Sequence, residues 1–132
     1  MLQFLNIFFL VFHTALILFN CVGWIWKRTR LWHLATIALT SLSWFVLGIW
    51  YGWGYCLCTD WHWQVREQLG YPNDHSYTHL LIQSVTGLDL NPDLTDTITV
   101  GVYVAVTLLT LVLNAKDWRQ RMRSKPLLNG RV

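Results

Sequence analysis

Charged residues are scarce in this chain and are missing from three long stretches. Asp, Glu, Lys and Arg make up 13% of the 132 residues, whereas soluble domains average about 25%. None of the four occurs in residues 1–26, 31–59 or 97–115. Three buried helices of a soluble protein would need polar outer faces, and these stretches have none. The absence of charge therefore excludes a soluble helical core.

Each uncharged stretch is long enough to cross a bilayer, because about 20 apolar helical residues span a hydrocarbon core of about 30 Å. We predict a single all-α membrane domain over residues 1–132, a three-helix bundle with spans over about 3–25, 31–55 and 95–116. The first stretch has no basic n-region and no small-residue cleavage site ahead of Lys27. It is therefore predicted to be a retained span rather than a signal peptide.

Catalytic motifs are also absent from the sequence. The three cysteines form neither a C-x-x-C motif nor a disulfide framework. A disulfide between Cys56 and Cys58 would close a small, strained ring, and Cys21 is predicted near the opposite leaflet. No phosphate-binding glycine loop and no Ser-His-Asp spacing is present. The sequence therefore favours a protein that is not an enzyme.

Basic residues are concentrated in two places, which predicts the orientation. Three of the ten basic residues lie in the 26–30 connector, and six lie at Lys116 or in the C-terminal tail, residues 117–132. The remaining one is Arg66. By the positive-inside rule, the 26–30 connector and the C-terminus face the cytoplasm, and the N-terminus and the 56–94 connector lie outside. We expect a bacterial cytoplasmic membrane, with the basic tail on anionic lipid and no nucleic-acid partner.

The outer connector is predicted to contain two short interfacial helices. Thr59 or Asp60 is a good N-cap for the first, and Gly70 a plausible stop. Residues 75–88 are uncharged apart from histidine and too short to span, so they predict an amphipathic helix lying in the interface. Asn91 and Pro92 then begin the third span as its cap and first helical residue.

His13 is the first candidate functional residue, because it falls near the middle of the first span, where a polar side chain without partners is costly. Asn20 shares its helix face. The histidine could be a haem ligand, a proton relay or a hydrogen-bond donor to a quinone. Alternatively, it is a neutral residue bonded to Thr or Ser of the second span, namely Thr36, Thr40 or Ser43. We expect His33, at the inner end of the second span, in a wet interface.

The outer connector supplies a second candidate set, which consists of Cys56, Cys58, His62, His75 and His79. His75 and His79 are four residues apart on a predicted helix, a spacing that lets two imidazoles hold one metal ion. Cysteine and His62 could complete a tetrahedral site. The alternative is a hydrated loop with scattered histidines.

The order of these residues resembles the small membrane proteins of the domain-of-unknown-function 2784 family, from about residue 7 to 115. The resemblance rests on a His in the first span, "LWH", "CLCT", "LGY" and a later His. Matching positions are His13, His33, Cys56, Thr59, Gly70, Tyr71 and His79. The chain departs at Leu57 and Cys58, where the family has Pro-Leu, and at His62, where it usually has Glu. The resemblance implies the architecture and favours Cys56 and His79, but it supplies no reaction.

The leading functional prediction is an accessory subunit or binding module with a polar pocket near the outer face. The pocket residues would be His13, Asn20, Cys56, Thr59 and His79, and the partners would be the lipid bilayer and a larger membrane complex. No cofactor is firmly implied by this prediction. The alternative is a redox protein that binds haem b or a transition metal through His13, Cys56 and His79.

Overall fold

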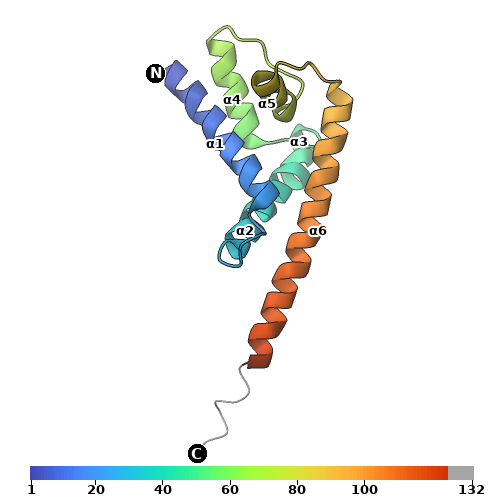
Figure 1. Cartoon of the computed structure of the whole chain (residues 1–132). Coiled ribbons are helices and arrows are strands. Elements are labelled where there is room, and N and C mark those ends of the chain that lie inside the picture. The colour runs from blue at the N-terminus through green and yellow to red at the C-terminus, as the bar shows by residue number, and fades with distance from the viewer. Residues whose placement is uncertain (125–132) are drawn as a thin grey trace, which may run out of the picture.

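The computed structural model describes residues 1–124, and every regular element in that range is helical (Figure 1). The predicted all-α class is therefore confirmed. In chain order the elements are α1 (Leu2–Val22), α2 (Arg30–Ser41), the π-helix η1 (Leu42–Leu47), α3 (Gly48–Tyr51), α4 (Leu57–Gln68), α5 (Tyr77–Thr86) and α6 (Pro92–Ser124).

Three helices are long and apolar enough to cross a membrane, as predicted: Leu2–Val22, Arg30–Tyr51 and Pro92–Ser124. The second runs without a break through α2, η1 and α3, and ends before Gly52, whose φ of 105° is left-handed. The third begins at Pro92, as expected, but continues to Ser124. Part of the predicted tail is therefore helical, and residues 125–132 lie outside the described residues.

His33 forms the joint where the three spans meet. Its side chain is fully buried, with Nε2 2.8 Å from the carbonyl oxygen of Asn20 on α1 and Nδ1 3.0 Å from Oγ1 of Thr110 on α6. Because a carbonyl only accepts, Nε2 carries the proton and Nδ1 accepts from the threonine. The expectation that His33 lies in a wet interface is wrong, because all three spans enclose the imidazole.

An ion pair adjoins this joint at the basic end of the protein. Arg30 of α2 donates from Nη1 to Asp117 of α6 at 2.8 Å, and from Nε to the carbonyl oxygen of Trp24 at 3.0 Å. Both charged side chains are mostly buried. The pair therefore ties α6 to the connector that joins the first two spans.

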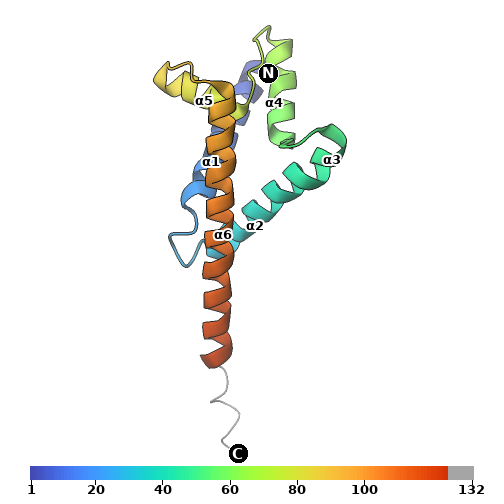
Figure 2. The same ribbon diagram turned by 90° about the vertical axis from the view of Figure 1, so that its right-hand side faces the viewer.

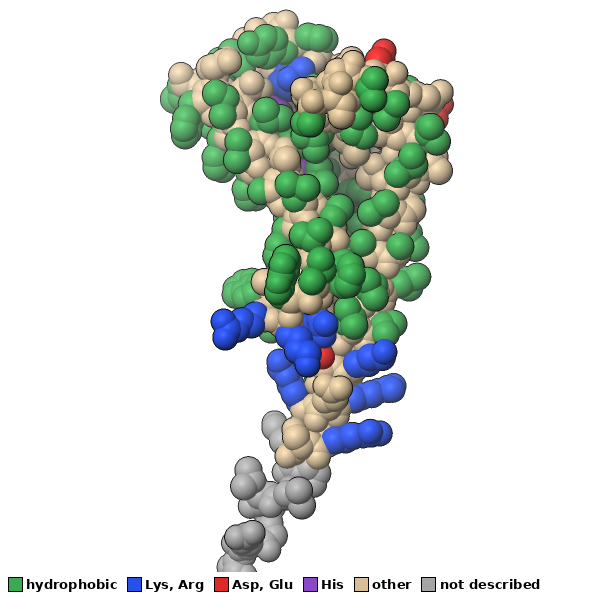
Figure 3. Space-filling model, in the orientation of Figure 1, with side chains coloured by type: hydrophobic (Ala, Val, Ile, Leu, Met, Phe, Trp, Pro, Cys, Tyr) green, Lys and Arg blue, Asp and Glu red, His purple; other side chains and the backbone are tan. Residues whose placement is uncertain are grey.

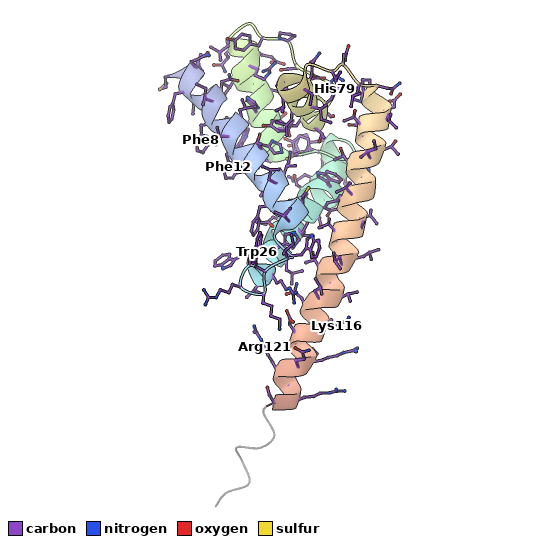
Figure 4. All side chains as sticks on the ribbon, in the orientation of Figure 1. Phe8, Phe12, Trp26, His79, Lys116 and Arg121 are labelled. Carbon is purple, nitrogen blue, oxygen red and sulfur yellow. The ribbon has the colours of Figure 1, made fainter. Side chains whose placement is uncertain are left out.

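The spans separate above the joint, and α4 and α5 cover the space between them. Figure 1 shows α1 and α6 diverging, and Figure 2 shows the second span inclined away from α6. The α4 helix packs along α1, while α5 contacts α6. Few residues of the spans are buried within the protein, so most of their apolar surface faces outward. Figure 4 shows this at Phe8 and Phe12, which project from the outer side of α1.

The joint makes Gly23 intolerant of a larger side chain. A Cβ added there would lie 2.7 Å from Cδ2 of His33 and 2.7 Å from the backbone oxygen of Phe19. We therefore expect Gly23→Ala to destabilise the protein by about 1–3 kcal/mol, the usual range for overpacking. Thermal unfolding in a mild detergent measures the change. Gly101→Ala is the matched control, since nothing lies within 4 Å of its added Cβ. Equal melting temperatures for the two variants would contradict a tightly closed joint.

Candidate functional site

A partly open cavity of about 640 Å³ lies where the spans diverge. Its lower walls are mostly apolar and come from all three spans, through Leu16, Ile17, Ile37 and Val106 among others, with Asn20 and Thr40 as polar members. Its upper end is polar and includes His13, Cys56, Thr59 and Tyr77. The cavity therefore has a hydrocarbon-like interior that ends in a cluster of hydrogen-bonding groups.

His13 occupies the centre of this polar end. It is 6% exposed, with Nε2 3.8 Å from Sγ of Cys56 and Nδ1 3.4 Å from Oγ1 of Thr59. Its ring stacks on Tyr77, with centroids 3.9 Å apart and planes 18° apart. The partners of His13 therefore come from α4 and α5, and both of its polar contacts are long.

The predicted bonds from His13 to the second span do not form, because those side chains are engaged elsewhere. Thr36 and Thr40 donate to backbone carbonyls one turn earlier in their own helix, at 2.9 Å. Ser43 donates to the carbonyl oxygen of Tyr55 at 2.9 Å. The local helix therefore satisfies two of these hydroxyls, and the loop before α4 satisfies the third.

Tyr77 locks α5 onto α1 beside His13. Its hydroxyl donates to the carbonyl oxygen of Leu10 at 2.9 Å and lies 3.2 Å from Oγ1 of Thr14. Ser76 caps α5 by accepting from the backbone N–H of His79 at 3.3 Å. The sequence places Tyr77 only on the apolar face of a predicted helix, so its contact with His13 was missed.

Cys56 is the N-cap of α4, in an extended conformation with φ −122° and ψ 116°. The hydroxyl of Ser43 holds the residues on either side of Cys56. It donates to the carbonyl oxygen of Tyr55 and accepts from the backbone N–H of Leu57 at 3.4 Å. Ser43 lies in η1, and π turns often occur at functional sites. The predicted caps at Thr59 or Asp60 are therefore wrong, since α4 begins earlier and Thr59 faces His13. The predicted stop is confirmed, because Gly70 follows the helix with φ 76°.

The two cysteines at this end differ in acidity. A hydrogen bond from the thiol of Cys58 lowers the pKa of Cys56 well below its ordinary value, and His13 lowers it further, although burial opposes both effects. The same bond, together with burial, raises the pKa of Cys58. Cys56 is therefore the more acidic thiol of the pair and the stronger nucleophile near neutral pH.

His62 contradicts the expectation of a hydrated loop with scattered histidines. It is fully buried between α4 and α1, with Nε2 2.9 Å from Oδ1 of Asn6 and its ring against Phe9. Burial lowers the pKa of His62 to about 4, and the charges of Arg66 and His13 act in the same direction. It is therefore a neutral side chain that fixes α4 on α1.

His75 and His79 have separate partners, although they are four residues apart. His75 lies 3.2 Å from a carboxylate oxygen of Asp96 on α6. His79 is 2.6 Å from Oδ1 of Asp74, 2.9 Å from the carbonyl oxygen of Leu90 and 3.3 Å from Oδ1 of Asp89. Figure 4 shows His79 close to the start of α6. The histidine pair therefore joins α5 to its flanking loops and α6.

The structure gathers only part of each predicted set. In the pocket set, His13, Cys56 and Thr59 lie together, Asn20 lines the same cavity below them, and His79 lies outside its lining. In the metal set, His62, His75 and His79 each have different partners. Within residues 1–124, no three His, Cys, Asp or Glu side chains are arranged to hold a metal ion.

Residues 3–115 match the family described as "Protein of Unknown function (DUF2784)", so the chain belongs to that family. The resemblance seen in the sequence is thereby confirmed. No curated protein and no solved structure matches the chain.

His79 should make the docking of α5 depend on pH. Both ring nitrogens face acceptors, and the carbonyl of Leu90 and the carboxylate of Asp74 raise the pKa of His79 above its ordinary value of 6.5, with a smaller contribution from Asp89. The stabilisation is therefore complete below about pH 6.5 and is lost as pH rises through the raised value. Hydrogen exchange of α5 amides, corrected for intrinsic rates, should show weaker protection at high pH. His79→Gln should abolish this dependence, whereas His75→Gln, which removes the pair with Asp96, should preserve it.

The thiols should differ in their reaction with iodoacetamide. Because the pKa of Cys56 is lowered and that of Cys58 is raised, we expect the alkylation rate at Cys56 to depend less on pH between about pH 6 and 9 than the rate at Cys58. Cys58→Ala removes the thiol donor and should make the rate at Cys56 rise with pH. Peptide mass mapping after timed labelling measures each site. A rate at wild-type Cys56 that increases about tenfold per pH unit would contradict the lowered pKa of this thiol.

Proposed function

We propose that the protein is a membrane binding module for an amphiphile, with the apolar chain between the spans and the head group at His13, Cys56 and Thr59. This proposal rests on the cavity of about 640 Å³, which is mostly apolar below and polar above. Ligand pockets of about 300–1,000 Å³ with a few convergent polar groups are typical of small-molecule sites. A molecule that is itself apolar at one end and polar at the other matches this division.

An unpaired group lower in the cavity supports the same proposal. Asn20 donates from Nδ2 to Oγ1 of Thr40 at 3.2 Å, but its Oδ1 is buried and accepts no hydrogen bond from residues 1–124. Leaving a buried acceptor unsatisfied costs about 1–3 kcal/mol. A ligand or water that brings a donor to this position would remove that cost.

The charges around the upper end favour a neutral head group. Asp60 and Asp96 line the cavity together with Cys56, and all three carry or favour negative charge. A phosphate would be repelled, because like charges in a site of low dielectric destabilise one another. The imidazole and hydroxyl groups can instead exchange hydrogen bonds with hydroxyl or carbonyl oxygens of an uncharged amphiphile.

The charge distribution supports an orientation with the cavity near the outer surface of a bacterial cytoplasmic membrane. Figure 3 shows most of the Lys and Arg side chains gathered below the apolar part of the surface, with Asp and Glu mostly at the opposite end. Figure 4 places Lys116 and Arg121 on the lower part of α6, far from His79. The positive-inside rule then puts the 26–30 connector and the C-terminal end of α6 in the cytoplasm, with α4 and α5 outside. In this orientation the module can serve a larger membrane complex through its exposed apolar faces.

Filling the cavity should remove the bound amphiphile. Ile17 lines the cavity, while the neighbouring Leu18 is 58% exposed on the outer side of α1. We expect Ile17→Trp to reduce binding of 1-O-decylglycerol at least tenfold, and Leu18→Trp to leave it unchanged. Native mass spectrometry of the protein in mild detergent measures both. Decyl phosphate, which has the same chain and an anionic head group, should bind wild type at least tenfold more weakly. Equal binding by both tryptophan variants would reject the proposal.

A further inference from the structure

We propose that Cys56 is a nucleophile that accepts the acyl group of an uncharged ester or thioester held in the cavity, with His13 as its base. This inference rests on the proposed function and adds a reaction to the same site. A thiol and a buried imidazole meet at the polar end of an apolar cavity, with Sγ 3.8 Å from Nε2.

The surroundings of His13 orient it for this role. Its Nδ1 lies 3.4 Å from Oγ1 of Thr59, and its ring is stacked against Tyr77. When Nδ1 carries the proton and donates to Thr59, Nε2 has a free lone pair directed at the thiol of Cys56. A nucleophile, a base and a group that orients the base form the arrangement found in covalent catalysis. Contacts of this kind are often long before substrate binds.

The start of α4 favours negative charge at Cys56. The first-turn N–H groups of an α-helix have no intrahelical partners and carry the positive end of the helix dipole. Leu57 N–H is taken by Ser43, which leaves those of Cys58 and Thr59 in the same turn. These N–H groups can stabilise both the thiolate and the oxyanion that forms when it attacks a carbonyl.

The reaction is balanced without any redox partner. His13 takes the proton from the thiol of Cys56, and the sulfur attacks the acyl carbonyl. The bond from the acyl carbon to the leaving oxygen or sulfur breaks, and His13 returns the proton to that leaving group. Cys56 is then a thioester, with its acyl chain along Leu16, Ile17 and Ile37. His13 next removes a proton from water, which attacks the thioester carbonyl, releases the fatty acid and restores the thiol.

Two donors of equal chain length test the inference and separate the possible leaving groups. These are p-nitrophenyl decanoate, an oxygen ester, and S-decanoyl-N-acetylcysteamine, a thioester. With purified protein in mild detergent, at least one donor should give a decanoyl mass shift that maps to Cys56 and is removed by hydroxylamine. His13→Gln should slow acylation by about 100-fold or more and make it rise with pH. Cys56→Ala and Cys56→Ser should abolish it at this position.

Cys21 is the internal cysteine control, because it lines the same cavity but lies eight residues and about 12 Å from His13 along α1. It should not be acylated. The inference is overturned if Cys56 is alkylated by iodoacetamide but acylated by neither donor, or if Cys21 or Cys58 is acylated as fast. Binding of 1-O-decylglycerol, an ether without an acyl group, separates the two proposals. Retained binding without acylation rejects only the reaction, whereas absent binding in wild type rejects the proposed function as well.

Discussion

The hydrogen bonds of His33 determine where the three spans come together, and the rest of the structure follows from that point. Helices in a bilayer gain little from burying apolar surface against one another, so packing and interhelical hydrogen bonds hold them. His33 links α2 to Asn20 of α1 and to Thr110 of α6. Above this joint the spans diverge (Figure 1), and the space between them becomes the cavity. The two hydrogen bonds of His33 at the joint therefore leave room for a site at the opposite end of the spans.

The α4 and α5 helices are held by histidines and a tyrosine rather than by a large apolar core. His62 bonds to Asn6 on α1, Tyr77 bonds to Leu10, and His79 bridges the loops on either side of α5. Each bond replaces water that a buried polar group would otherwise need. Because these bonds connect α4 and α5 to α1 and α6, the two helices are positioned over the cavity and bring Cys56 to His13.

The sequence predicted the spans well because length and missing charge are local properties. The helix start at Pro92 and the stop at Gly70 could also be predicted, since each residue acts through its own backbone. The burial of individual side chains could not be predicted in the same way. His33 and His62 look interfacial or hydrated from their neighbours in the chain, but they are enclosed by helices distant in sequence. The π turn at Ser43 and the early start of α4 also depend on a contact between η1 and the loop at Tyr55.

His33 and His13 are both buried histidines of the spans, but only His33 has two short hydrogen bonds. This difference indicates that His33 is structural and that His13 belongs to a binding site. His33 has both nitrogens at 2.8 and 3.0 Å from well-matched partners, so it has no capacity for a ligand. His13 is nearly as buried, yet its contacts are 3.4 and 3.8 Å long and one partner is sulfur. A buried imidazole with weak partners is costly, unless another molecule completes its hydrogen bonds. Since His13 also faces a cavity that holds the unpaired oxygen of Asn20, unsatisfied polar groups are found where the cavity could receive a ligand.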